Sequence, residues 1–418
     1  MTNSSKIFEG FVYNQLIRFV QYNNILSPNQ YVFQNGKSTE NAVTAIVSQI
    51  LKAKERKNHP TSTFLGFAKA CDTVNHDILV KKSNYYGIQD QALEWFKSYL
   101  SNRTQFTQIG DTLSDIGYVK HGVPQGSVLG PLLFLIYIND ITEASTMLKF
   151  YLFADDTTVF YSDKTNPETE ALLNLELSKV SDWLAANKLS LNVGKSNFLH
   201  FHHGKSRKEI LNIMIDDTEV KEKESTKYLG VMMDNKLNWK THIQITQTKL
   251  SKGICILAKT RYFVTDKVML NLYYSYFQSH LNYNILNLSM ANSSSLKPIR
   301  NAVKKAVRIM SFKNKYEHTA PLFKKFEILS FDFHVQHKQA VFMWKLSNEL
   351  ILPPISNLFS KNTYNSSKFN LPKSNVSQKA ITFSGVKLWN SGITESLKNK
   401  STLKSFSSAY KKALLDSI

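Results

Sequence analysis

Residues 148–161 read LKFYLFADDTTVFY and place Asp155 and Asp156 side by side between two apolar, aromatic-rich runs. Runs of this composition are typical of buried strands, so the stretch predicts a β-hairpin with the two acids at its tip. Adjacent carboxylates at the end of an apolar hairpin repel each other and lose hydration. A divalent cation, Mg²⁺ or Mn²⁺, would offset both effects. The alternative is a polar turn in which both carboxylates point to water.

The composition favours a polyanionic partner. The chain has 418 residues, enough for two or three domains, and 42% of them are hydrophobic. Its 52 basic and 32 acidic side chains give a formal charge of +20. This charge favours nucleic acid over a membrane surface, because no single basic amphipathic tail carries it. A merely soluble basic protein is the alternative.

The two cysteines, Cys71 and Cys255, exclude a disulfide framework and a cysteine zinc site. They favour a reducing compartment, so we expect the cytoplasm, the nucleus or both. No apolar run approaches the length of a membrane span, and no membrane partner is expected.

Hydrophobic periodicity predicts an α+β chain. The predicted helices cover residues 7–25, from 40 onward, 90–101, 132–141, from 166 with Asn166 as N-cap, much of the chain after 236, and 401–415; the predicted strands cover 63–67, the hairpin, 197–202 and 228–233. Residues 353–378 form a loose connector rich in Pro, Asn, Ser and Lys. Arg300, Lys304 and Arg308 recur every fourth residue, so their face requires either an anion or solvent.

Three blocks carry a family resemblance: residues 122–134 (GVPQGSVLGPLLF), 138–140 (IND) and 153–156 (FADD). Further matching pieces lie at residues 5–9, 38–40, 72–76, 95–103, 183–189 and 228–230. In order and spacing, over nearly the whole chain, these blocks resemble the reverse transcriptases of non-LTR (LINE-type, jockey-like) retrotransposons.

The resemblance implies a right-hand polymerase fold of the α+β class, with an antiparallel palm sheet and a helical, basic thumb and C-terminal extension. The expected parts are truncated fingers at 1–62, the palm with some fingers elements at 63–235, a thumb-like helical region at 236–350, and a connector with the C-terminal extension at 351–418. The fingers are called truncated because the family's fingers begin further upstream, with a basic Arg-Pro-Ile strand that this sequence lacks.

The implied activity is RNA-directed DNA synthesis, which adds dNTPs to a DNA primer on an RNA template. Such nucleotidyl transfer uses two metal ions about 3.5–4 Å apart, held by carboxylates. In the resemblance Asp155 is a ligand of the ions and Asp156 its weaker neighbour. Lys195, in the segment LNVGK, lies where the family has a lysine near the triphosphate and is a candidate general acid. A surface lysine without a role is the alternative.

The GVPQGS loop is a candidate nucleotide site. Gly126 has no side chain, so a base or sugar can approach its backbone, while the amide of Gln125 offers a donor and an acceptor. A plain Pro-Gly turn is the alternative. Candidate contacts to nucleic-acid phosphates are Lys37, Arg103, Arg300, Lys304 and Arg308, each with solvation as its alternative.

Two departures from the family concern catalysis. Gly66 stands where the family has a third carboxylate, and Cys71 stands where it has an aromatic residue that excludes a ribose 2′-hydroxyl. Asp72 lies six residues after Gly66, up to about 20 Å away along an extended strand, so it is a poor substitute without a sharp turn.

With the third carboxylate missing, the loss of several kcal/mol of transition-state stabilisation corresponds to a rate several thousand-fold lower or worse. We therefore expect a reverse-transcriptase domain that keeps its fold, with impaired or absent catalysis and weaker discrimination between dNTP and rNTP. An active polymerase is one alternative. The other is a non-catalytic protein, derived from a reverse transcriptase, that binds RNA or RNA–DNA hybrid.

Overall fold

The chain forms two compact units, each built from segments that are not contiguous in sequence. The computed structural model describes residues 3–34, 36–202, 211–351, 353–363, 367–372, 378 and 380–418. Unit 1 comprises Met1–Asn35, Asn58–His200 and Gly204–Lys223, and unit 2 comprises Gly36–Lys57, Phe201–His203 and Glu224–Ile418. Both helices and strands are present, so the predicted α+β class is confirmed.

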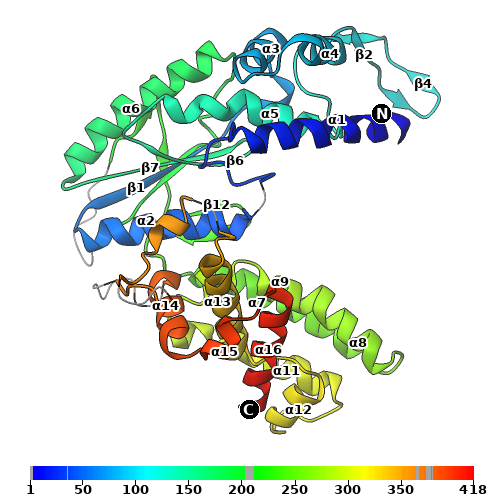
Figure 1. Ribbon diagram of the computed structural model, residues 1–418, viewed down its shortest axis with the longest axis vertical. Helices are drawn as coiled ribbons and strands as arrows, with labels where there is room; N and C mark the ends of the chain where they lie inside the picture. The colour runs from blue at the N-terminus through cyan, green and yellow to red at the C-terminus, as the bar shows by residue number, and fades with distance from the viewer. Residues whose placement is uncertain are drawn as a thin grey trace. The chain divides into compact units, whose positions relative to one another are not determined.

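The sheet of unit 1 has five strands in the order β11-β8-β1-β7-β6 (Figure 1). The strands are β1 (His59–Leu65), β6 (Lys149–Phe153), β7 (Asp156–Asp163), β8 (Asn197–His200) and β11 (Lys221–Glu222). The pairs β8–β1, β1–β7 and β7–β6 are antiparallel, whereas β11 runs parallel to β8. The prediction of an antiparallel sheet is therefore correct for four strands and wrong for the fifth.

The predicted hairpin is confirmed as β6 and β7. Phe153 pairs with Asp156, so the connection is the two residues Ala154 and Asp155, and Ala154 has a positive φ of 54°. The open edge of β6 is covered by the segment 29–31. There Tyr31 N donates to Leu152 O at 2.8 Å and Leu152 N donates to the carbonyl of residue 29 at 2.9 Å. This pairing fixes the hairpin on both sides.

The main helices of unit 1 are α1 (Asn3–Tyr22), α3 (His76–Tyr85), α4 (Asp90–Leu100), α5 (Gly130–Ile138) and α6 (Asn166–Ala186). Its short elements are η1 (Ala70–Asp72), β2 (Arg103–Gln105), β3 (Gln108–Ile109), β4 (Thr112–Leu113), β5 (Gly117–Val119), η2 (Asn139–Glu143), β9 (Met214–Ile215) and β10 (Thr218–Glu219).

The predicted N-cap of α6 is wrong by one residue. Thr165 has the extended backbone of a cap, and its hydroxyl accepts a hydrogen bond from Glu168 N at 3.3 Å. Asn166 and Pro167 are the first helical residues. Threonine and asparagine are both favourable N-caps, and proline suits the first turn in either register, so the sequence did not separate them.

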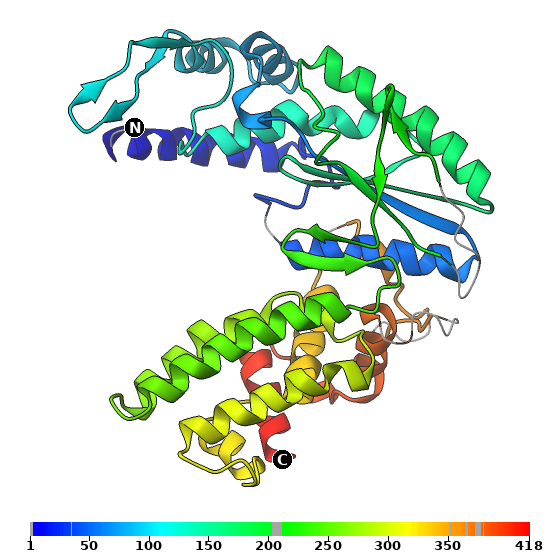
Figure 2. The same cartoon turned by 180° about the vertical axis from the view of Figure 1, so that it is seen from behind.

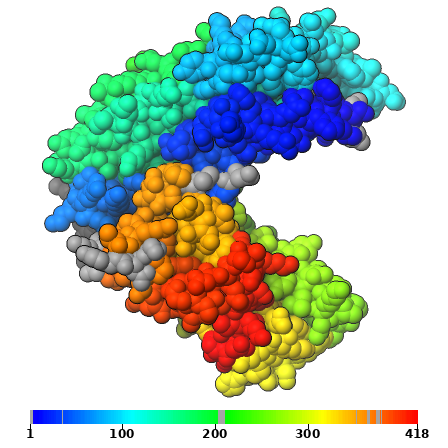
Figure 3. All heavy atoms as spheres, in the orientation of Figure 1, coloured from blue at the N-terminus to red at the C-terminus, as the bar shows by residue number. Residues whose placement is uncertain are grey.

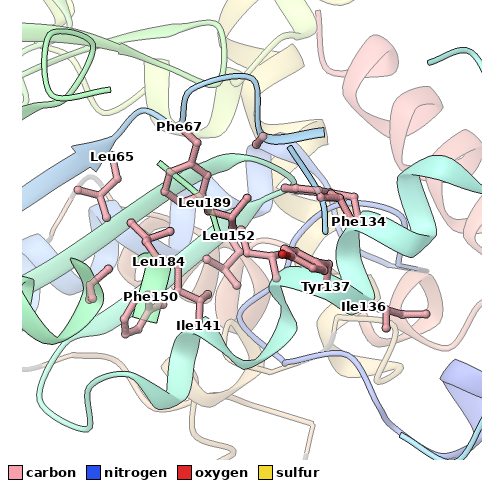
Figure 4. Close-up of a cluster of buried hydrophobic side chains, with 14 of the residues drawn as sticks. Leu65, Phe67, Phe134, Ile136, Tyr137, Ile141, Phe150, Leu152, Leu184 and Leu189 are labelled. Carbon is pink, nitrogen blue, oxygen red and sulfur yellow. The ribbon is translucent and has the colours of Figure 1, made fainter. Parts of the chain in front are cut away.

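A large apolar cluster lies at the centre of unit 1. The helix α5 is buried on all sides, as predicted for the apolar run after the GVPQGS loop, and it ends at Ile138 with a 3₁₀ turn beyond. Figure 4 shows Phe134 and Tyr137 of this helix in the same cluster as Phe150 and Leu152 of β6. The hairpin therefore packs on the hydrophobic core of unit 1.

Only the second half of α1 contributes to this cluster. Leu16 and Val20 are buried, whereas Ile7 is 65% exposed and Phe8 is 56% exposed. The predicted helix at residues 7–25 is confirmed as Asn3–Tyr22, and its apolar residues near the N-terminal end are exposed.

Unit 2 is mostly helical (Figure 2). Its longer elements are α2 (Thr39–Glu55), the hairpin of β12 (Ser225–Tyr228) and β13 (Val231–Asp234), α7 (Lys240–Thr260), α8 (Asp266–Tyr273), α11 (Ser293–Met310), α13 (Phe331–Ser347), α14 (Ile381–Ser391) and α16 (Leu403–Asp416). Short elements join them: η3 (Tyr274–Gln278), α9 (Ser279–Asn282), α10 (Ile285–Leu288), α12 (Ala320–Lys325), η4 (Ser356–Leu358) and α15 (Glu395–Lys398). Helix α7 packs on α11, and α13 packs on α14 and α16.

None of the helices in the described ranges offers an apolar stretch long enough to cross a bilayer.

A buried histidine on α7 makes unit 2 sensitive to acid. His242 is 4% exposed, and among the described residues neither ring nitrogen has a hydrogen-bond partner. Burial, with Lys249 adding to it, lowers the pKa of His242 from 6.5 to about 4. Because the folded-state pKa lies below the unfolded one, the unfolded state binds the proton first, so this histidine lowers the stability as the pH falls from about 6.5 toward 4. Above pH 6.5 its titration does not change the stability.

We expect His242→Leu to stabilise the protein by about 1–3 kcal/mol at neutral pH, because an unpartnered buried polar ring is replaced by an apolar group. The variant should also lose less stability than the wild type between pH 7.5 and pH 5. Thermal unfolding at both pH values measures this. His280→Leu, an exposed site, is the control and should change neither value. A destabilised His242→Leu variant would contradict the expectation.

Candidate active site

The acid pair lies beside Gly66. Asp155 occupies the hairpin turn and Asp156 is the first residue of β7, and both are exposed. Leu65, the last residue of β1, pairs with Thr157 in the antiparallel ladder. Continuing that register by one residue brings Gly66 level with Asp156. The strand that carries the glycine and the turn that carries the acids therefore end at the same place.

The electrostatic consequence of adjacent acids is visible at Asp156. Partial desolvation raises the pKa of its carboxyl, and the negative charge of Asp155 raises it further. A nearby cation would reverse both effects.

A buried glutamine that the sequence did not single out holds the turn. Gln30 is 2% exposed, and its Oε1 accepts hydrogen bonds from Ala154 N at 3.2 Å and from Tyr31 N at 3.1 Å. Its side chain therefore fixes the residue just before Asp155. No local pattern predicts this, because the contact joins residues 124 positions apart.

A loop packs directly onto Gly66. The glycine N donates to Ser196 Oγ at 3.1 Å, and its carbonyl accepts from Asn192 N at 2.7 Å. A Cβ built on Gly66 would lie 2.8 Å from the Cβ of Lys195. The structure thus brings the candidate lysine against the position of the missing carboxylate, while its side chain remains exposed.

The GVPQGS loop packs on the segment that follows β1. Val123 N donates to Cys71 O at 2.8 Å. Gln125 Nε2 donates to Asp72 Oδ1 at 2.8 Å, which leaves the amide oxygen of Gln125 for other partners. Gly126, with a φ of 77°, has open space where a side chain would be. The candidate nucleotide residues are therefore neighbours in space as well as in the family pattern.

Asp72 does not lie at the end of an extended strand, because the chain turns sharply before it. Lys69 adopts a left-handed conformation with a φ of 49°, and the 3₁₀ turn η1 follows it. The sharp turn brings Asp72 to Gln125.

The pKa of Cys71 is affected by burial and by two acidic side chains. Burial raises the pKa of its thiol to about 11, and the charges of Asp155 and Asp72 contribute in that order. The thiol is therefore neutral at physiological pH. Its side chain is smaller than the aromatic ring that the family resemblance implies at this position.

The predicted phosphate contacts lie in both units. Arg103 belongs to unit 1, where its guanidinium lies 5.3 Å from the Tyr99 ring centre. Together with Phe8, Glu9 and Trp95 it lines a pocket of about 390 Å³. Lys37 belongs to unit 2, and burial lowers its pKa to about 8.

The basic stripe of α11 is partly occupied by the protein itself. Arg300 Nε donates to Asp332 Oδ2 at 2.9 Å, and Arg308 Nε donates to the carbonyl of Glu317 at 2.9 Å. Lys304 is exposed. The negative charge beside Arg300 is thus supplied by the protein's own Asp332. Of the three basic residues, Lys304 has the most accessible charge.

The carboxylates of the site do not fit a two-ion centre. Asp155 and Asp156 are hard oxygen donors of the type that Mg²⁺ prefers, but Gly66 supplies no ligand. Within the described part of the chain, no three His, Cys, Asp or Glu side chains come together closely enough to hold a metal ion.

The strand-borne acid pair, the Gly-rich loop beside it and the apolar helix that follows are a polymerase arrangement, and comparison of the sequence agrees. Residues 1–233 match the family model described as reverse transcriptase (RNA-dependent DNA polymerase). The chain belongs to this family and therefore has a polymerase fold. Its relatives are those of the LINE type, the non-LTR retrotransposons.

Two relatives come from Drosophila melanogaster. The probable RNA-directed DNA polymerase from transposon X-element is 28% identical over 278 residues, which cover 64% of this chain and 29% of that protein. The RNA-directed DNA polymerase from mobile element jockey is 25% identical over 356 residues, which cover 82% of this chain and 38% of that protein. The chain thus spans well under half the length of the curated relatives that it matches.

Solved structures give a weaker likeness. Apo telomerase from Candida tropicalis is 12% identical, with a TM-score of 0.41, over 75% of this chain and 53% of that one. Telomerase from Candida albicans in complex with a fragment of telomeric RNA is 13% identical, with a TM-score of 0.33, over 70% of this chain and 52% of that one.

Proposed function

We propose that this chain is a retrotransposon-derived RNA-directed DNA polymerase domain whose catalysis is lost or strongly impaired, and which still binds RNA or RNA–DNA hybrid. The observation that carries the proposal is Gly66, level with Asp156 in the sheet register and one residue from Asp155. The hairpin is intact and well anchored, so the fold keeps the position of catalysis while one of its ligands is missing.

The proposed architecture is a right hand. Residues 1–62 would belong to the fingers, 63–235 to the palm, 236–350 to the thumb-like region, and 351–418 to the connector and C-terminal extension. The five-stranded sheet with its acid hairpin supports the palm assignment. The helical, basic character of the chain after β13 supports the thumb.

Within this site Asp155 and Asp156 would hold the cation, Mg²⁺ or Mn²⁺, that an active relative uses. Because Gly66 adds no ligand, we derive no catalytic step through a pair of ions. The remaining residues would bind and position nucleotide. The open space at Gly126 admits a sugar or base next to the backbone, and the free amide oxygen of Gln125 can accept a hydrogen bond from it. Lys195, next to this site, would neutralise charge on the triphosphate.

The proposed partners are an RNA template, a DNA primer or RNA–DNA hybrid, and dNTPs, with the cytoplasm, the nucleus or both as the place of action. The excess of 52 basic over 32 acidic side chains supports the nucleic acids. Cys71, in place of an aromatic residue, would let rNTPs bind nearly as well as dNTPs.

Primer extension on a poly(A)·oligo(dT) template, with Mg²⁺ and separately with Mn²⁺, tests the catalytic part. We expect incorporation several thousand-fold below that of a relative with the third carboxylate, since several kcal/mol of transition-state stabilisation are missing. Asp155→Ala should reduce this weak signal at most to the background without protein. Robust incorporation that Asp155→Ala abolishes would overturn the proposed impairment.

Binding is tested separately. The affinity for an RNA–DNA duplex, measured by fluorescence anisotropy between about 50 and 200 mM salt, should fall steeply because bound phosphates release counterions. An affinity that stays constant over this range would contradict electrostatic binding by the chain.

A further inference from the structure

Two loops at one end of unit 2 expose aromatic side chains. We call this surface the aromatic tip: Arg261, Tyr262 and Phe263, which follow α7, and residues 312–316, which follow α11. Tyr262 is 65% exposed and Phe263 is 85% exposed. On the second loop, Phe312 is 54% and Tyr316 is 80% exposed. Figure 3 shows the yellow segment that contains the second loop at the surface of the molecule.

Contacts between the loops order this surface. The rings of Tyr262 and Phe312 meet edge to face, with centres 5.3 Å apart. The guanidinium of Arg261 lies 4.7 Å from the centre of the first ring and 4.9 Å from that of the second. Arg261 also reaches the carbonyl of Ile309 at the end of α11. The two loops therefore present their rings together.

The charge around the rings is positive. Residues 259–267 and 312–318 contain five basic side chains and two acidic ones. Both acids are paired with lysines: Asp266 with Lys325 at 3.3 Å and Glu317 with Lys313 at 3.7 Å. Lys315 lies 4.8 Å from the ring centre of Tyr316. Positively charged side chains therefore lie beside exposed rings of both loops.

Surfaces that bind proteins and surfaces that bind single-stranded nucleic acid differ in composition. A hydrophobic protein interface buries aliphatic and aromatic side chains with few charges at its centre. All four large apolar side chains exposed on these two loops are aromatic, and Arg261 and Lys315 lie against three of their rings. Flat rings interleaved with positive charge are the combination that stacks bases and neutralises phosphates in single-stranded nucleic acid.

We propose that the aromatic tip binds single-stranded RNA by stacking unpaired bases on Phe263 and Tyr316, the two most exposed rings, while Arg261 and Lys315 neutralise the neighbouring phosphates. This inference goes beyond the proposed function, because the tip contains no residue of the acid hairpin or of the GVPQGS loop. Stacking on a ring face tolerates any base, so the tip should bind without strong sequence preference.

The test uses the full chain and two labelled probes of equal length: an oligo(rU) 12-mer and a blunt RNA–DNA duplex. The variant is Phe263→Ala combined with Tyr316→Ala, two side chains so exposed that their removal leaves the fold intact. We expect its affinity for the single strand to fall about 30-fold or more, because each of the two stacking rings removed accounts for about 5- to 150-fold. Its affinity for the duplex should change less than about two-fold. Tyr22→Ala with Tyr85→Ala, at sites 87% and 83% exposed in unit 1, is the matched control and should bind both probes as the wild type does.

Unchanged affinity of the double variant for oligo(rU) would overturn the proposal, as would an equal loss for both probes. A wild-type chain that binds the duplex but not oligo(rU) would overturn it while leaving the proposed function intact. Light scattering adds a further check. If the wild type is dimeric and the double variant monomeric, the tip is a contact between protein copies, and the proposal fails.

Discussion

Gly66→Asp is expected to destabilise the protein by about 1–3 kcal/mol, the usual effect of overfilling a packed position. The new Cβ would lie 2.8 Å from the Cβ of Lys195. That atom is attached to the loop backbone, which is itself tied to Gly66 by a hydrogen bond from Asn192 N. The loop must move before an aspartate fits, so restoring the family's residue carries an energetic penalty that the sequence alone does not suggest.

Chemical denaturation measures the effect, and Gly194→Asp is the matched control. Gly194 lies on the same loop, it is exposed, and a Cβ there meets only a side-chain oxygen at 3.4 Å. This control should lose less than about 0.5 kcal/mol, as surface substitutions usually do. Adding Lys195→Gly to Gly66→Asp removes the clashing atom and should recover most of the loss. A Gly66→Asp variant as stable as the wild type would show that the loop yields freely.

Asp140→Ala is expected to cost roughly 2–4 kcal/mol, near the lower end of the range for breaking a buried ion pair. Lys82 Nζ lies 2.5 Å from Asp140 Oδ1 and donates to Tyr137 O at 2.7 Å. The ammonium also lies 4.7 Å from the centre of the Trp183 ring. The lysine side chain is 13% exposed, so removing the aspartate leaves a largely buried charge without its partner.

The control for this prediction is Glu94→Ala. Glu94 also pairs with a lysine, Lys97, at 2.6 Å, but the two side chains are 69% and 44% exposed. An exposed pair of this kind contributes about 0–1 kcal/mol. Thermal unfolding should therefore separate the two alanine variants clearly. Replacing both members of the buried pair, as in Asp140→Asn with Lys82→Met, should cost less than Asp140→Ala alone. Equal effects of Asp140→Ala and Glu94→Ala would show that Lys82 is adequately solvated.

The sequence predicted the features whose signal is local. The acid hairpin, the apolar helix after the GVPQGS loop and the amphipathic helix that begins near residue 166 each have a composition or spacing that specifies them. The family blocks predicted the neighbourhood of Gly66, Gln125 and the acid pair, because their order reflects a common fold.

What the sequence did not predict depends on contacts between distant residues. Gln30 looks like an ordinary turn residue until the fold carries it to Ala154. The sharp turn that brings Asp72 back could not be predicted, because the left-handed residue before it is a lysine and gives no turn signal. The periodicity of α1 continues through Ile7 and Phe8, but nothing within unit 1 buries them. An apolar stripe on a helix indicates which side chains can be buried, but it does not indicate which element of the fold covers them.

Because segments of the two units alternate along the sequence, some contacts within unit 2 can form only late in synthesis. Helix α2, at residues 39–55, packs on α10, which the ribosome adds only after residue 285. The bond from Asn287 Nδ2 to Thr44 Oγ1 joins positions 243 apart. Until then the side chains of α2 that contact α10, Thr44 among them, lack that partner. A fragment that ends at residue 233 lacks α10, so the apolar side chains of α2 that α10 covers would be exposed and prone to aggregation.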